Sequence, residues 1–237
     1  IVVSGGDNYQ GEALSNLSRG DLVNALYGLI GVQFSAVGNH EFDWGTEHFT
    51  RWNDSGVRFL GANILERKTG KVPAWAKPYA IVQIGGHRVA FIGLSTRETV
   101  GSTAAKHLKG LKFERADVAA ARWVEYLKQG RDMRGVPDAI ILLTHIPSFQ
   151  ENASGLIFGD ELSELTRIKG VDAVITGHSH RRVSGRHEGV PVVQAACFGK
   201  AVGVLRLDFD GEQLAGINPE VIELKGQIGR ASCRERV

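Results

Sequence analysis

Cysteine is scarce in this sequence, which contains only Cys197 and Cys233 among its 237 residues. Two cysteines cannot build a disulfide framework, and without a cluster of thiolates a structural zinc site of the cysteine type is excluded. No apolar run approaches the roughly 20 residues that a membrane-spanning helix needs, so we expect no membrane insertion. We also find no internal repeat and no low-complexity segment.

The sequence also has no large excess of positive or negative charge. Lysine and arginine number 28, aspartate and glutamate number 26, and the formal net charge is +2. With no long basic run in the body of the chain, electrostatics give no reason to propose a nucleic-acid-binding surface. Hydrophobic residues make up 43% of the sequence, which is ordinary for a globular protein and enough for a sizeable core.

The two ends of the sequence differ from its body. Ile1-Val2-Val3 already resembles a buried strand, so we expect that the true N-terminus has been lost and that a missing targeting segment is uninformative. Residues 226–237 lack periodicity and are rich in arginine. We predict that this tail is non-native or disordered, and we assign residues 1–225 to a single domain.

Short apolar runs recur along the chain, each followed by a turn that carries polar or ionisable residues. Runs this short and fully apolar are typical of strands covered on both faces. The runs are residues 1–3, 34–37, 140–143 and 173–175, and the turns after them contain Gly5-Gly6-Asp7, Gly38-Asn39-His40, Thr144-His145 and Gly177-His178-Ser179-His180.

Helices are predicted between these strands, on the evidence of apolar residues at helical spacing. The candidates span residues 21–30, 45–53, 116–128 and 160–168. Two further segments, 79–94 around Gly85-Gly86 and 202–224 around Asp210-Gly211, have the pattern of hairpins. Strands that alternate with helices predict an α/β layered domain.

The polar residues that follow the strands are candidates for a common site, because open α/β sheets bind ligands at the carboxyl edge of their strands. A carboxylate, an amide and several imidazoles suit divalent zinc, manganese or iron. Two such ions about 3.5–4 Å apart can clamp a displacement at phosphorus. The candidate residues are Asp7, Asn39, His40, His145, His178 and His180.

His40 and Asp43 form a second pattern within this set. They stand three residues apart, so on a turn or helix the carboxylate can reach the imidazole. An aspartate that orients a histidine and raises its basicity is an established acid–base pairing. We therefore predict that this pair transfers a proton during catalysis.

These motifs, in this order, resemble those of the calcineurin-like metallophosphoesterases over roughly residues 1–224. The block from Gly38 to Gly45, together with Asn8-Tyr9-Gln10-Gly11, is similar to the 5′-nucleotidase and 2′,3′-cyclic-nucleotide phosphodiesterase branch. The resemblance implies a layered metallophosphatase fold, in which mixed β-sheets are sandwiched together and flanked by helices. The first strand of that fold would be missing here.

The resemblance also implies two divalent metal ions and a role for each residue. Asp7 would bridge the ions, Asn39, His145 and His178 would complete the shell of one ion, and His180 would bind the other. His40 and Asp43 would be the catalytic dyad. The family has an earlier Asp-x-His motif that gives two ligands to the second ion. These 237 residues lack it, so we expect the chain alone to bind its second metal poorly and to hydrolyse little or nothing.

The implied activity is hydrolysis of nucleotide phosphoesters. Alternatives are a related enzyme acting on cyclic nucleotides, UDP-sugars, another phosphoester or a sulfur-oxidation intermediate, and a non-catalytic binding module. A metallo-β-lactamase-like hydrolase ranks low, because Arg181 and Arg182 follow the histidine pair where that class has aspartate and histidine. By resemblance, the full-length protein would add a C-terminal nucleoside-binding domain and be periplasmic, secreted or attached to the cell surface.

The remaining chemistry-bearing residues have more ordinary interpretations. We expect Glu41 to support the site without binding metal, and Cys197 to pack as a small hydrophobic residue. The four tryptophans are predicted to pack in the core, and four histidines outside the motifs are predicted to lie on the surface. These are Trp44, Trp52, Trp75, Trp123, His48, His87, His107 and His187.

Overall fold

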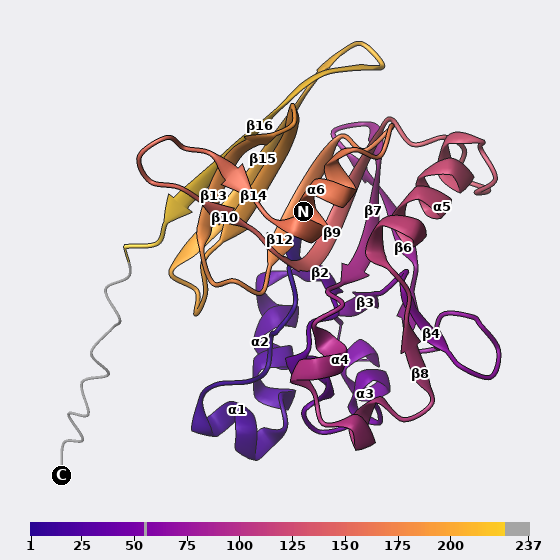
Figure 1. Cartoon of the computed structure of the whole chain (residues 1–237), viewed down its shortest axis with the longest axis vertical. Coiled ribbons are helices and arrows are strands. Elements are labelled where there is room, and N and C mark those ends of the chain that lie inside the picture. The colour runs from indigo at the N-terminus through magenta and orange to yellow at the C-terminus, as the bar shows by residue number, and fades with distance from the viewer. Residues whose placement is uncertain (55, 226–237) are drawn as a thin grey trace.

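Two β-sheets form the centre of the computed structural model, which describes residues 1–54 and 56–225 (Figure 1). The predicted tail, 226–237, lies outside the described residues. The first sheet is parallel and has the order β1 (Val2–Ser4), β2 (Val32–Ala36), β3 (Arg58–Leu60) and β5 (Ala76–Lys77). The second sheet is mixed and has the order β13 (Arg182–His187), β14 (Val190–Ala195), β12 (Ala173–Gly177), β9 (Ala139–Pro147), β7 (His87–Ser95) and β6 (Tyr79–Ile84).

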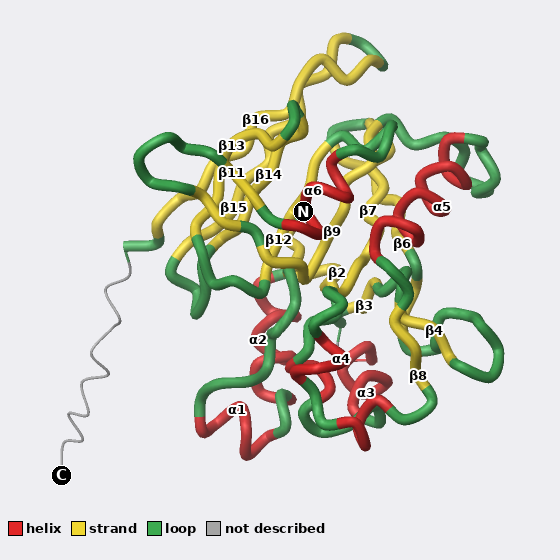
Figure 2. The backbone as a smooth tube through the Cα atoms, in the orientation of Figure 1, coloured by secondary structure: helices red, strands yellow, loops and turns green. Residues whose placement is uncertain are grey.

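Helices and two-stranded sheets lie around these two sheets (Figure 2). The helices are α1 (Ala13–Ser18), α2 (Asp21–Ile30), α3 (His48–Asp54), α4 (Thr99–Ser102), α5 (Ala116–Lys128) and α6 (Asp160–Thr166), with 3-10 turns at His40–Phe42 and Ala105–Leu108. The remaining strands pair as β4 (Ile64–Glu66) with β8 (Leu111–Phe113), β10 (Phe149–Gln150) with β11 (Ile157–Phe158), and β15 (Ala201–Asp210) with β16 (Gln213–Glu223). Over the described ranges, every helix is too short or too polar to cross a bilayer.

Strand β9 shows why the central runs are apolar without alternation. Ile140 and Leu142 are fully buried on the face that α5 and α6 cover, while Ile141 and Leu143 are buried between the two sheets. A side chain of this size contributes about 1.5–3 kcal/mol when it is removed from water. The strand is therefore stabilised on both faces, and the predicted layered architecture is confirmed.

The predicted elements agree closely with the observed ones. Helices α2 and α5 begin and end at the predicted residues, and both predicted hairpins are present as β6–β7 and β15–β16. Helix α3 begins later than predicted, at His48, because Gly45 has a left-handed φ of 88° that no α-helix accommodates. Helix α6 ends at Thr166, before the predicted end at residue 168.

The surface prediction for His48 was wrong. Its imidazole belongs to a side chain only 5% exposed and stacks on Trp52 at 5.7 Å, because α3 packs against an aromatic cluster under the first sheet. His87, His107 and His187 are half-buried. The four tryptophans pack in the core clusters as predicted. Cys197 is only partly buried.

A polar contact outside the core ties β6 to the loop after α5. The Tyr79 hydroxyl donates to Asp132 at 2.6 Å, and the Arg134 guanidinium donates to both oxygens of Asp132 at 2.8 Å. Arg134 and Tyr79 hold the pKa of Asp132 well below its usual value, against the effect of burial. Ionised Asp132 therefore stabilises the fold.

We expect Asp132→Asn to lower the free energy of unfolding at pH 7 by roughly 1–2 kcal/mol, since hydrogen bonds to a charged acceptor are lost. A depressed pKa gives stability that is present above the unfolded value of about 3.9 and is lost as the pH falls. The difference from wild type should therefore shrink below pH ~4 in urea titrations. Asp210→Asn in the exposed β15–β16 turn is the matched control, and an equal effect there would contradict the assignment.

Candidate active site

The site is built at one edge of the two sheets, where four strands end. Strands β1 and β2 are parallel neighbours in the first sheet, and β9 and β12 are parallel neighbours in the second. Parallel strands end at the same edge, so the turns that follow them meet. Asp7 follows β1, His145 lies near the end of β9, and His178 directly follows β12.

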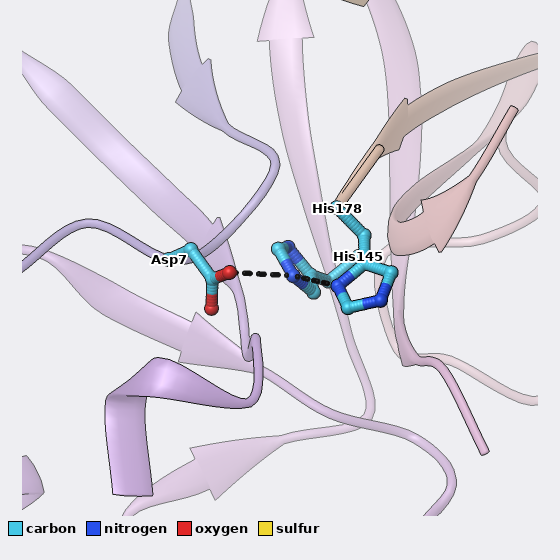
Figure 3. Close-up of side chains that lie close together, drawn as sticks. All are labelled: Asp7, His145 and His178. Carbon is cyan, nitrogen blue, oxygen red and sulfur yellow. Dashed lines mark hydrogen bonds and ion pairs between the residues drawn. The ribbon is translucent and has the colours of Figure 1, made fainter. Parts of the chain in front are cut away.

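Three of the predicted ligands converge there (Figure 3). Asp7 Oδ2 lies 3.0 Å from His145 Nε2, and His145 Nε2 lies 3.1 Å from His178 Nδ1. The potential ligand atoms of the three residues all lie within 4.8 Å of one another. Ligand atoms that share one tetrahedral or octahedral ion at about 2.1 Å are themselves about 3 Å or slightly more apart. The Asp7–His145 and His145–His178 separations therefore match those of ligands on one metal ion.

The hydrogen bonding of His145 prepares it for a cation. Its Nδ1 lies 2.7 Å from the carbonyl oxygen of Gly5, which can only accept, so Nδ1 carries the proton. Nε2 is then the nitrogen that faces Asp7 and His178. Without a metal its proton donates to Asp7 Oδ2 at 3.0 Å, and a cation would take the place of that proton. A histidine that donates one ring N–H to a backbone carbonyl and offers the other nitrogen is typical of metal ligation.

The electrostatics of the pair agree with this geometry. Burial opposes the charged form of both groups, yet the hydrogen bond and charge of Asp7 raise the pKa of His145 above its ordinary value. The same contact with His145, aided by the backbone N–H of His40, lowers the pKa of Asp7. A buried carboxylate is thus stabilised by positive charge at this point, and a divalent ion would supply more of it.

Asn39 provides an independent sign of a missing partner. It is 4% exposed, and its Oδ1 is buried with no hydrogen-bond donor in the described structure. An unsatisfied buried polar atom costs about 1–3 kcal/mol. Its neighbour His40 donates its backbone N–H to Asp7 Oδ1 at 2.9 Å, which places the Asn39 turn against Asp7. An amide oxygen without a donor fits a divalent cation.

The backbone at the site is tightly constrained. A Cβ at Gly38 would lie 2.1 Å from Asp7 Oδ1 and 2.8 Å from its backbone nitrogen, so only glycine fits. Asp7, His178 and His180 all adopt left-handed φ angles, of 58°, 66° and 56°. Strained conformations of non-glycine residues persist where the surrounding structure enforces them, and they cluster at functional sites.

The two residues predicted to form the catalytic dyad are in contact, and their catalytic role stays a prediction. His40 Nδ1 lies 2.8 Å from Asp43 Oδ2, and the imidazole is 41% exposed while the carboxylate is 23% exposed. His40 begins the 3-10 turn that follows Asn39, and Asp43 is the residue directly after that turn. Asp43 therefore fixes the ring so that Nε2 is the nitrogen left for a substrate.

His180 is not part of the tight cluster of imidazole and carboxylate groups. Its ring lies 5.7 Å from the ring of Phe198, an exposed residue in the loop between β14 and β15. The role of His180 as a ligand of a second ion stays a prediction.

Glu41 supports the site as predicted, and it does so through the backbone. Its fully buried carboxylate accepts the N–H groups of Asp7 at 2.9 Å, Asn8 at 2.7 Å and Gly38 at 2.5 Å. Burial, together with the charge of Asp7, raises the pKa of Glu41 to about 7 although these N–H groups oppose the shift. Glu41 thus joins the turn that carries Asp7 to the turn that carries Asn39.

One residue at the site was missed by the sequence interpretation. Glu98 Oε2 lies 2.8 Å from His178 Nε2. It belongs to the polar turn Ser95-Thr96-Arg97-Glu98, which follows the apolar part of β7. The same pattern of an apolar run and a polar turn predicted the other site residues, so it could have indicated Glu98 as well.

Comparison with known sequences identifies relatives over most of the chain. The sequence profile described as calcineurin-like phosphoesterase matches residues 1–182. The chain is 30% identical over 226 residues to endonuclease YhcR of Bacillus subtilis, an alignment of 89% of this chain and 18% of the relative. It is 27% identical to the 5′-nucleotidase of Vibrio parahaemolyticus, over 100% of this chain and 46% of the relative. The chain thus spans less than half the length of these two relatives.

Solved structures are similar over almost the whole chain. The 5′-nucleotidase precursor of Thermus thermophilus matches with a TM-score of 0.75 and 26% identity, covering 94% of this chain and 45% of that one. The sulfate thiohydrolase SoxB of the same organism matches with a TM-score of 0.77 and 25% identity, covering 94% and 38%. Since the profile covers most of the chain, this protein belongs to the calcineurin-like phosphoesterase family.

Proposed function

We propose that this chain carries the metal-binding part of a hydrolase that cleaves phosphoesters of nucleotides. The observation that carries the proposal is the convergence of Asp7, His145 and His178 within 4.8 Å, beside the His40–Asp43 pair. A binding module on the same fold would need neither a buried carboxylate–imidazole cluster nor an oriented acid–base pair.

Asp7, Asn39, His145 and His178 would hold one divalent ion, and Asp7 and His180 would contribute to a second. Their oxygen and nitrogen donors suit zinc, manganese or iron. When bound, such ions supply positive charge to the phosphoryl oxygens and lower the pKa of water.

The chain's own residues perform the remaining steps in this proposal. Asp43 accepts the Nδ1 proton of His40 in a hydrogen bond of 2.8 Å and holds the ring in a fixed orientation. His40 Nε2, which faces away from Asp43, then donates a proton to the leaving oxygen of the ester. Glu41 keeps the two ligand-bearing turns at a fixed separation while this occurs.

Nucleotides are proposed as the substrate class because several relatives of this chain are 5′-nucleotidases. One relative is an endonuclease and one structural neighbour a sulfate thiohydrolase, so nucleic acid and sulfur esters belong in the same assay panel as cyclic nucleotides and UDP-sugars. We also propose an extracellular location, since a cell wall protein of Listeria monocytogenes is 25% identical. A C-terminal nucleoside-binding domain in the whole protein is a further part of the proposal.

The 237-residue chain alone is expected to bind about one transition-metal ion and to hydrolyse little AMP in the presence of Mn²⁺. The reason is that, in this proposal, these residues supply a complete set of ligands for only one of the two ions. Grafting an upstream Asp-x-His strand from a 5′-nucleotidase relative should raise the metal content to about two and restore turnover. Metal content is measured by mass spectrometry and hydrolysis by phosphate release.

His40→Asn in the grafted protein is the matched variant for this test. It should lower kcat by about 100-fold or more with the metal content unchanged, because general acid catalysis contributes roughly 10²–10⁴-fold. Substantial turnover by the 237-residue chain would contradict the proposal that the second ion lacks ligands in these residues. A grafted protein that binds no metal would favour the binding module.

A further inference from the structure

Glu98 makes a contact that none of the predicted roles explains. Its carboxylate lies 2.8 Å from Nε2 of His178, while Nδ1 of the same ring faces His145 at 3.1 Å. The ring of His178 is thus held between a carboxylate on one side and the ligand cluster on the other. Glu98 is not among the residues of that cluster.

The backbone that carries Glu98 is anchored on both sides. Thr96 donates its backbone N–H to the carbonyl of His145 at 3.0 Å and its hydroxyl to the buried Glu161 at 2.6 Å. Arg97 forms an ion pair of 2.6 Å with Glu164. The turn is therefore fastened to β9 and to α6, and it presents Glu98 to His178 from a fixed position.

This contact decides which nitrogen of His178 carries the proton. An ionised carboxylate only accepts, so Nε2 must donate to Glu98, and in the neutral ring Nδ1 is then left with its lone pair. In the other tautomer Nδ1–H would point at the cluster and prevent ligation there. We propose that Glu98 is a positioning residue that holds His178 in the tautomer able to bind a divalent cation through Nδ1.

The proposal rests on the proposed metal site and adds a residue to it. Carboxylate partners of metal-bound histidines change metal affinity by about 10–100-fold when they are removed. The side chain of Glu98 is 58% exposed, so solvent screens the contact and the lower end of that range is expected.

The test compares Glu98→Ala and Glu98→Gln by calorimetric titration of the 237-residue chain with Mn²⁺. Glu98→Ala should weaken binding about tenfold, whereas Glu98→Gln should remain near wild type because its amide oxygen still accepts the Nε2 proton. The fold should tolerate both changes, since Glu98 makes no side-chain capping bond to α4. Glu125→Ala, which removes an exposed glutamate from α5, is the matched control.

Nitrogen-15 NMR of the imidazoles in the metal-free chain gives a readout independent of metal. His178 should be protonated at Nε2 in wild type and Glu98→Gln, and should shift towards the Nδ1 tautomer or a mixture in Glu98→Ala. Unchanged affinity and tautomer in Glu98→Ala would overturn the proposal. Equal weakening by Ala and Gln would also overturn it, in favour of a purely electrostatic effect.

The metal site and the role of Glu98 fail in different ways. If wild type binds Mn²⁺ and Asp7→Asn abolishes binding while Glu98→Ala has no effect, the metal site stands and only the role of Glu98 is wrong. If wild type itself binds no divalent metal, the proposed function fails and the role of Glu98 fails with it.

Discussion

Replacing Asp7 by asparagine is expected to reduce the affinity of the chain for Mn²⁺ by more than about 100-fold. Removing a residue that only supports a ligand costs about 10–100-fold, and Asp7 would itself be a ligand. Its Oδ2 contacts His145 at 3.0 Å, and in our proposal it is the one carboxylate of the complete shell. An amide has no charge to offer the cation, so most of the attraction is lost.

The fold should survive this change. Asparagine keeps an Oδ1 that can accept the backbone N–H of His40, now 2.9 Å from Asp7, and its amide N–H can donate to the lone pair of His145 Nε2. A buried charge is also removed, which offsets part of the lost interaction. We therefore expect a midpoint of thermal unfolding within a few degrees of wild type in the metal-free chain.

Thermal unfolding with and without metal provides the measurement. Ligand binding to the native state stabilises it by RT ln(1 + [L]/Kd), so MnCl₂ at about 100 times Kd should stabilise wild type by about 2.7 kcal/mol and the variant hardly at all. Asp210→Asn removes the same charge far along the chain and should respond as wild type does. A variant that still gains full stability from Mn²⁺ would contradict the assignment of Asp7.

The layered fold and most of the carboxylate–imidazole cluster could be predicted from the sequence for a common reason. Central strands buried on both faces leave unbroken apolar runs, and parallel strands end at one edge, so the residues after these runs must meet. Asp7, His145 and His178 are far apart in the sequence, yet each stands closely behind such a run. Each run and its turn can be recognised from neighbouring residues in the sequence, and the parallel strands then bring the turns together in space.

Contacts made by side chains across the fold could not be predicted in this way. Glu98 and His178 are 80 residues apart, and the residues around Glu98 do not indicate which imidazole its carboxylate contacts. His48 has a polar side chain on a short helix, and its burial depends on Trp52 and the rest of the aromatic cluster. Such pairings depend on how helices and loops pack on the sheets, and the hydrophobic pattern does not encode that packing by itself.

Glu41→Ala is expected to lower the free energy of unfolding by roughly 3–5 kcal/mol, the largest effect on stability that we predict at the site. The carboxylate accepts three backbone N–H groups, at 2.5, 2.7 and 2.9 Å, and its side chain is fully buried. Alanine leaves these donors without a partner and opens a cavity, and each unsatisfied buried group costs about 1–3 kcal/mol. Urea titration of the metal-free chain measures the change.

The same substitution should also weaken Mn²⁺ binding, because Glu41 joins the turn that carries Asp7 to the turn that carries Asn39. Glu41→Gln separates the two effects. The side-chain oxygen of glutamine can still accept some of the three backbone N–H groups. Its NH₂ group takes the place of the other carboxylate oxygen and cannot accept the remaining ones. We therefore expect an intermediate loss of about 2 kcal/mol in the free energy of unfolding. Glu125→Ala on the exposed face of α5 should change neither quantity. If Glu41→Ala unfolds at the wild-type urea concentration, the backbone contacts of Glu41 do not stabilise the site, and the coupling between its two turns must come from elsewhere.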